Sequence, residues 1–148
     1  MQYLPNKKLI LPEGFFVESS HIPPARLINK LLISCGSDFF SNSKLTLAIK
    51  NSNFFFTINS ETNNQIYGFV RVTSDKGLNA NLWNLCAQPG GNQKLFYLVL
   101  LKLTLEKINR KMPGCSISVQ APPSSFESLE ESGFILDPNG IRVMGFKL

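Results

Sequence analysis

The stretch NANLWNLCAQPGGNQKLFYLVLLKLT, residues 79–104, joins a strand-forming segment to a long apolar helix through a Pro-Gly-Gly turn. Polar and apolar residues alternate from residue 79, and the run ends in Leu85-Cys86-Ala87, which is typical of a strand at the centre of a sheet. Pro89 ends this strand, and a helix is predicted over 93–111. A strand that leads into a helix N-terminus presents free backbone N–H groups, so the turn is a candidate phosphate site.

The segments around this unit predict further strands. Alternating or β-rich residues between turn signals place them over 14–20, 53–58, 66–73, 115–120, 134–136 and 141–147. With the helices, the order is strand, helix, three successive strands, long helix, strand, short helix and a closing strand pair. This order predicts an α+β fold around a mixed sheet, with residues 1–148 forming a single domain.

Two other helices are predicted, each with its own terminal signals. The first covers 24–35, with proline in its first turn and Gly36 as its C-cap. The second covers 124–132 and begins with a capping-box pattern, Ser124 to Glu127. Segment 37–51 stays open between an extended piece and a short helix, because its leucines alternate while two phenylalanines break the pattern.

Composition narrows the functional classes. An apolar fraction of 43% with 17% charged residues indicates a folded globular protein. The three cysteines include no CxxC pair, and their odd number argues against a disulfide framework, so a reducing, cytoplasmic location is expected. His21 is the single histidine, so a histidine-based zinc site has no partner ligands and no metal is expected.

Charge and hydropathy argue against two kinds of partner. No apolar run reaches about 18 residues, so no membrane association is expected. The net charge of +5 is scattered, and the aromatic residues Trp83 and Phe54 to Phe56 lie in predicted strands without interleaved Lys or Arg. We therefore expect core packing for these aromatics and no nucleic-acid platform.

Two stretches resemble a known family. IYGFVRVTSDKGLNANLWNLCAQP, residues 66–89, resembles the third and fourth strands of small single-domain members of the GNAT acyltransferase superfamily. LEESGFILDPNGIRVMGFKL, residues 129–148, resembles the last helix and terminal hairpin of the same group. The resemblance implies a twisted mixed sheet with helices on both faces, whose fourth and fifth strands splay apart to admit acetyl-CoA.

The resemblance also implies which residues would hold this cofactor. Backbone groups of Leu85, Cys86 and Ala87 would bond the pantetheine arm. The diphosphate would lie on a Gln/Arg-x-x-Gly-x-Gly/Ala loop, which falls on Asn92, Gln93, Lys94, Leu95, Phe96 and Tyr97.

This loop departs from the family pattern. Asn92 replaces the family's Gln or Arg, and Gln93, Leu95 and Tyr97 stand where glycine is expected. Diphosphate oxygens must approach backbone N–H groups within about 3 Å, which side-chain bulk can obstruct. Lys94 and the helix dipole could still support weak acetyl-CoA binding, and an ordinary strand-to-helix loop is the alternative.

The catalytic positions of the family are also changed. Asn84 stands where close relatives carry an acid, and Leu129 stands where the family has a proton-donating tyrosine. Tyr97 and Tyr67 are possible substitutes, although packing explains both more simply. No catalytic residue is assigned.

These observations lead to two alternative functions. The first is a GNAT-family N-acetyltransferase-like protein, or pseudoenzyme, with a degenerate acetyl-CoA loop and activity that is weak, altered or absent. The second is a non-catalytic protein-interaction module on the same fold. The possible partners are an amine substrate or a protein. Glu127, Glu130 and Glu131 could draw a cationic amine, although their helical spacing is more typical of a solvated face. The acyl acceptor and the oligomeric state stay open.

Overall fold

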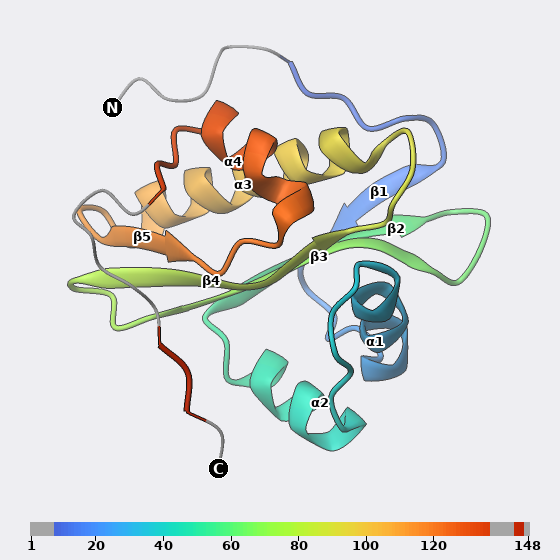
Figure 1. Ribbon diagram of the computed structural model, residues 1–148, viewed down its shortest axis with the longest axis horizontal. Helices are drawn as coiled ribbons and strands as arrows, with labels where there is room; N and C mark the ends of the chain where they lie inside the picture. Colours follow the sequence, from blue (N-terminus) through green and yellow to red (C-terminus); the bar gives the residue numbers. More distant parts are fainter. Residues whose placement is uncertain (1–7, 137–143, 147–148) are drawn as a thin grey trace.

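The computed structural model describes residues 8–136 and 144–146, and it places a five-stranded sheet between two layers of helices (Figure 1). The strands are β1 (Phe15–Glu18), β2 (Phe54–Ser60), β3 (Ile66–Ser74), β4 (Asn79–Ala87) and β5 (Ser116–Val119). The helices are α1 (Ala25–Ser34), α2 (Asn42–Lys50), α3 (Gln93–Lys111) and α4 (Phe126–Glu131), with a 3-10 turn, η1 (Pro123–Ser125), before α4.

The strands lie in chain order, β1-β2-β3-β4-β5. The first three pairs are antiparallel, and β4 pairs with β5 in parallel because the long helix α3 carries the chain back between them. α3 and α4 cover one face of the sheet, and α1 and α2 cover the other (Figure 1). The predicted α+β fold with a mixed sheet and helices on both faces is confirmed.

The consecutive phenylalanines of β2 show how the two faces share the core. Phe54 and Phe56 are buried in the cluster under α3, whereas Phe55 is buried in the cluster under α1 and α2. This division follows from the two-residue period of a strand, which sends successive side chains to opposite faces. β2 therefore reads as a continuous apolar run because helices cover it on both sides.

The ambiguous segment 37–51 is helical from Asn42 to Lys50. Ser41 caps this helix, since its hydroxyl accepts a hydrogen bond from the backbone N–H of Lys44 at 3.3 Å. Leu45 and Ile49 are buried one helical turn apart, and Leu47 between them is exposed.

Gly36 ends α1 as predicted. Its φ angle is +77°, its N–H donates to the carbonyl of Ile33, and the N–H of Ser37 donates to the carbonyl of Leu32, both at 3.0 Å. This is a Schellman motif, and glycine suits it because a Cβ atom disfavours the left-handed conformation.

Two predictions for the C-terminal third were wrong. The capping box does not form: the helix starts through η1, and the Ser124 hydroxyl contacts the Tyr97 hydroxyl instead of a backbone N–H. Residues 134–136 are irregular, because the N–H of Phe134 bonds the carbonyl of Leu129 and so continues the end of α4. The strand predicted over 141–147 has no regular structure at 144–146 and otherwise lies outside the described residues.

Candidate functional site

β4 and β5 separate where the resemblance places the cofactor. Their parallel pairing runs from Asn79 opposite Ser116 to Leu82 opposite Val119 and stops there. β4 continues through Trp83–Ala87, still paired with β3 on its other side. β4 and β5 are therefore the parallel pair of the predicted mixed sheet, and the second half of β4 has a backbone edge without a neighbouring strand among the described residues.

A bulge lies at the start of this unpaired edge. β3 pairs Arg71 with Trp83 and Phe69 with Cys86, so two residues of β4 stand opposite one residue of β3. Asn84 takes the left-handed conformation, with φ at +54°, which asparagine tolerates better than most residues.

The side chain of Asn84 is held in place by a cation. Its Oδ1 accepts a hydrogen bond of 2.7 Å from Nε of Arg71, whose guanidinium lies 5.8 Å from the centre of the Trp83 ring. Burial lowers the pKa of Arg71 from its ordinary value. The position that carries an acid in close relatives thus holds a neutral amide beside a guanidinium, and neither group serves as a general base.

The carbonyl of Ala87, at the end of β4, already has two hydrogen-bond donors. Nε2 of Gln93 donates to it at 3.0 Å, and the thiol of Cys35 donates at 3.1 Å. A carbonyl oxygen has two lone pairs, so both are used. Gln93 occupies a predicted glycine position, and its side chain folds back onto the strand that the resemblance assigns to the cofactor.

The turn between β4 and α3 is shaped by its own backbone. Gly90 has a φ angle of +143°, a region that favours glycine, and its carbonyl accepts a hydrogen bond from the N–H of Gln93 at 3.2 Å. Asn92 occupies the N-cap position of α3 without a side-chain capping bond, and its carbonyl accepts from the N–H of Phe96 at 2.9 Å.

The three apolar residues of the predicted diphosphate loop pack toward the core. Phe96 and Tyr97 are buried in the cluster under α3, and Leu95 is half-buried against the same cluster. The Tyr97 hydroxyl lies 2.8 Å from the Ser124 hydroxyl and so joins α3 to η1. Burial raises the pKa of Tyr97, which keeps its hydroxyl protonated. That Leu95 and Tyr97 fill the space of the phosphates stays a prediction.

Lys94 is paired with α4. Its Nζ lies 2.6 Å from a carboxylate oxygen of Glu127 and 2.5 Å from one of Glu131, and these hydrogen bonds raise the pKa of Lys94. A phosphate at the start of α3 would therefore compete with two carboxylates for this ammonium group.

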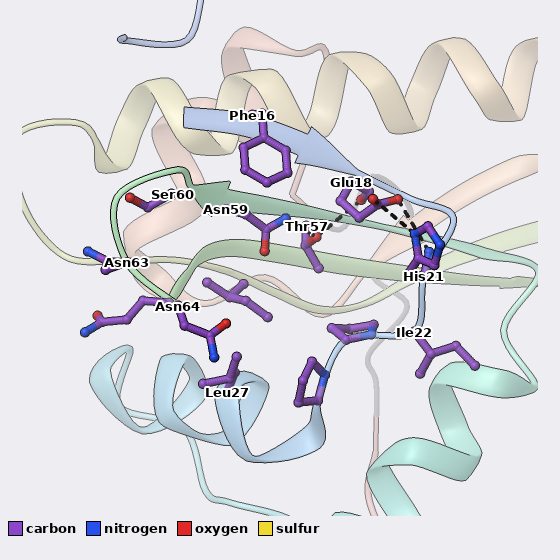
Figure 2. Close-up of a pocket in the computed structure, with 14 residues that line it drawn as sticks. Phe16, Glu18, His21, Ile22, Leu27, Thr57, Asn59, Ser60, Asn63 and Asn64 are labelled. Carbon is purple, nitrogen blue, oxygen red and sulfur yellow. Dashed lines mark hydrogen bonds and ion pairs between the residues drawn. The ribbon is translucent and has the colours of Figure 1, made fainter. Parts of the chain in front are cut away.

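A hollow of about 240 Å³ lies at the opposite edge of the sheet, between β1, α1 and the β2–β3 hairpin (Figure 2). Glu18 and His21 lie together in it, and Asn59, Asn63 and Asn64 follow the hairpin. The Glu18 carboxylate accepts hydrogen bonds from its own turn: the hydroxyl and N–H of Ser20 and the N–H of Ser19 at 2.5–2.7 Å, with Nδ1 of His21 at 3.4 Å. These bonds, led by those of Ser20, lower its pKa to about 2.

The Glu18 bonds hold the turn that follows β1, and the hollow is remote from the β4–β5 opening. Within 8–136 and 144–146, no group of three or more His, Cys, Asp or Glu residues is arranged to hold a metal ion. None of the helices in that part of the chain has the length and apolar character needed to cross a membrane.

The structure thus brings most of the predicted cofactor residues to one place, the end of β4 and the start of α3. It adds two residues that sequence reasoning missed, Cys35 and Ser124. Nothing in the sequence pairs Cys35 with Ala87, which is 52 residues away, and the capping-box pattern gave Ser124 a different partner.

Comparison with known proteins adds sequence relatives. No model of a protein family matches the chain. The uncharacterized N-acetyltransferase ycf52 of Pyropia yezoensis is 28% identical over 103 residues, which are 68% of this chain and 59% of that protein. The histone acetyltransferase TAP1 of Glycine max is 30% identical over 111 residues, 69% of this chain and 48% of that protein. The GCN5-related N-acetyltransferase 1, chloroplastic, of Arabidopsis thaliana is 22% identical over 119 residues, 80% of this chain and 60% of that protein. The chain spans less than two thirds of the length of each of these three relatives.

Solved structures share the fold. A probable acetyltransferase from meticillin-resistant Staphylococcus aureus gives a TM-score of 0.78 at 16% identity, over 90% of this chain and 100% of that chain. A predicted acetyltransferase from Clostridium acetobutylicum, solved with acetyl-CoA, gives a TM-score of 0.63 at 13% identity, over 88% of this chain and 96% of that chain. The sequence relatives, among them one that is 30% identical over 69% of this chain, show that the chain belongs to the GNAT acyltransferase superfamily, and the shared fold and the parallel β4–β5 pair agree with this assignment.

Proposed function

We propose that this chain is an N-acetyltransferase-like domain that takes acetyl-CoA between β4 and β5, through a diphosphate loop so altered that binding is weak and activity is weak, altered or absent. One observation carries the proposal. The parallel ladder stops at Leu82 and Val119, whereas β4 continues to Ala87 with an edge that an extended ligand could pair with. The Clostridium acetobutylicum neighbour, which contains acetyl-CoA, supports this choice of cofactor.

The residues fit one half of this cofactor better than the other. Backbone groups of Trp83–Ala87 suit the amides of a pantetheine arm, because strand edges bind extended chains through main-chain hydrogen bonds. The loop suits the diphosphate less well, since Gln93, Leu95 and Tyr97 stand where the family has glycine. Lys94 is also paired with Glu127 and Glu131. Bound acetyl-CoA would supply an activated acetyl thioester.

The chain's own contribution to acetyl transfer is positioning. Asn84 and Arg71 provide no base, and Leu129, at the family's acid position, is buried in the core. Tyr97 keeps its proton, but its hydroxyl is engaged with Ser124. An amine that arrives already deprotonated would still be aligned by a ternary complex, which by itself accelerates transfer. This arrangement supports slow acetylation more readily than fast acetylation.

The acceptor we propose is an amine, as the N-acetyltransferase names of the relatives suggest. The same names favour an acetyltransferase over a non-catalytic interaction module. One relative is named chloroplastic, so an organelle joins the cytoplasm as a candidate location.

A backbone NMR titration with acetyl-CoA tests the cofactor site. We expect the amide signals of Trp83–Ala87 and of the first turn of α3 to shift together, because both border the proposed slot. Signals around Glu18 and Asn63 serve as the internal control, since they line the hollow at the opposite edge of the sheet. Shifts confined to that hollow, or no shift at any residue, would overturn the proposal.

A further inference from the structure

We propose that Cys35 and Cys86 form a redox-active thiol pair, which a hydroperoxide converts into a disulfide between the end of α1 and the end of β4. This inference concerns two thiols that acetyl transfer does not use, and it stands whether or not the chain binds acetyl-CoA. It assigns a modification site whose substrate is a small hydroperoxide.

The fold brings the two thiols together from distant parts of the sequence. Cys35 directly follows α1, and Cys86 is the last residue but one of β4. The Cys35 thiol donates to the carbonyl of Ala87, the neighbour of Cys86, at 3.1 Å. The Cys86 side chain lies in the cluster under α1, and Cys35 packs against the same cluster.

The two thiols differ in access and in acidity. Cys35 is half-buried, so a small oxidant can reach its sulfur, whereas Cys86 is 1% exposed. The neighbouring Cys86 thiol lowers the pKa of Cys35 to about 7, and burial raises the pKa of Cys86. Since the thiolate is the nucleophile, Cys35 is the attacking residue and Cys86 the resolving one.

The chemistry balances with the peroxide as the only oxidant. The Cys35 thiolate attacks one peroxide oxygen, the O–O bond breaks, and Cys35 becomes a sulfenic acid while hydroxide (or an alkoxide) leaves and takes up a proton. The Cys86 sulfur then attacks the Cys35 sulfur, the S–O bond breaks, and water leaves with the Cys86 proton. Two thiols are oxidised by two electrons, and one peroxide bond is reduced.

The third cysteine provides an internal control. Cys115 is half-buried like Cys35, but it packs against the cluster on the opposite face of the sheet, under α3. If half-buried thiols were oxidised in general, Cys35 and Cys115 would react alike. If Cys35 and Cys86 act as a pair, these two residues are oxidised together and Cys115 is not.

Mass spectrometry of the full chain after brief exposure to hydrogen peroxide tests the inference. We expect a loss of two hydrogens, a Cys35–Cys86 linked peptide after non-reducing digestion, and full reversal by a thiol reductant. The Cys115→Ser variant should behave like the parent. The Cys86→Ser variant should stop at a Cys35 sulfenic acid that dimedone traps, and Cys86→Ala replaces it if the buried hydroxyl prevents folding. Preferential oxidation of Cys115, disulfides only between two chains, or a Cys35 that reacts no faster than free cysteine would overturn the proposal.

Discussion

Replacing Gln93 by glycine should tighten the binding of acetyl-CoA. Gln93 stands at a position where the family has glycine, and its amide nitrogen bonds the Ala87 carbonyl at 3.0 Å. A pantetheine amide that uses this carbonyl must first displace the Gln93 side chain. Glycine removes both the competing donor and the bulk at the start of α3.

The magnitude follows from the interactions exchanged. One neutral hydrogen bond contributes about 1 kcal/mol net, so freeing the Ala87 carbonyl should lower the Kd about fivefold. Each charge-assisted bond that a phosphate then makes to a backbone N–H of α3 adds about 1.5–3 kcal/mol. The protein itself should lose about 2 kcal/mol of unfolding free energy, from the lost bond and from glycine in the first helical turn.

Isothermal titration calorimetry measures the affinity, and thermal unfolding measures the stability. The matched control is Gln93→Leu, which removes the donor and keeps the bulk. We expect Gln93→Leu to gain only the fivefold due to Ala87, and Gln93→Gly to exceed it. A folded Gln93→Gly variant whose affinity stays within about twofold of the parent, or equal gains in both variants, would refute the argument that bulk obstructs the loop.

Tyr97→Phe removes the 2.8 Å contact with the Ser124 hydroxyl and should lower the free energy of unfolding by about 1 kcal/mol. The melting temperature should fall by roughly 2–4 °C. An unchanged melting temperature would show that this contact does not hold α3 to η1. Gly36→Ala should destabilise the protein by about 1–2 kcal/mol, because φ at this residue is +77°. The control Gly91→Ala, where φ lies outside the left-handed region and an added Cβ meets open space, should change stability by no more than about 0.5 kcal/mol. Equal losses in urea unfolding would contradict the strain argument. Glu18 has a folded pKa of about 2, below its ordinary 4.5, so its stabilisation is complete above pH 4.5 and is lost as the pH falls toward 2. The difference in urea midpoint between the parent and Glu18→Gln should shrink over that range, and a constant difference would contradict the assignment.

Local signals predicted the central unit of the fold correctly. The strand over 79–87 and the helix over 93–111 match the structure at both ends, because alternation, Pro89 and Gly90 mark the boundary between them. The segment around Leu47 stayed ambiguous because residues at 45, 47 and 49 alternate like a strand, yet only the first and last of them are buried on one helical face.

The errors arose where a distant residue competes with a local motif. Ser124 and Glu127 satisfy a capping-box pattern. In the structure, however, the Ser124 hydroxyl contacts the Tyr97 hydroxyl, and the Glu127 carboxylate accepts a hydrogen bond from Lys94. The mixed sheet that the sequence predicts has its parallel pair at β4 and β5, whereas the assignment of Leu85, Cys86 and Ala87 to the cofactor stays a prediction. The hydrogen bond to the Ala87 carbonyl could not be predicted, since its thiol donor, Cys35, lies 52 residues earlier in the sequence, directly after α1.

The most direct test of the account compares two ligands by calorimetry, acetyl-CoA and S-acetylpantetheine, which lacks the diphosphate and the nucleotide. If β4 binds the pantetheine arm and the loop around Gln93 contributes little, the two Kd values should agree within about threefold, and both should lie well above the low micromolar range. An intact diphosphate loop would add several charge-assisted hydrogen bonds. Low micromolar binding of acetyl-CoA, with S-acetylpantetheine weaker by about a hundredfold or more, would contradict the account.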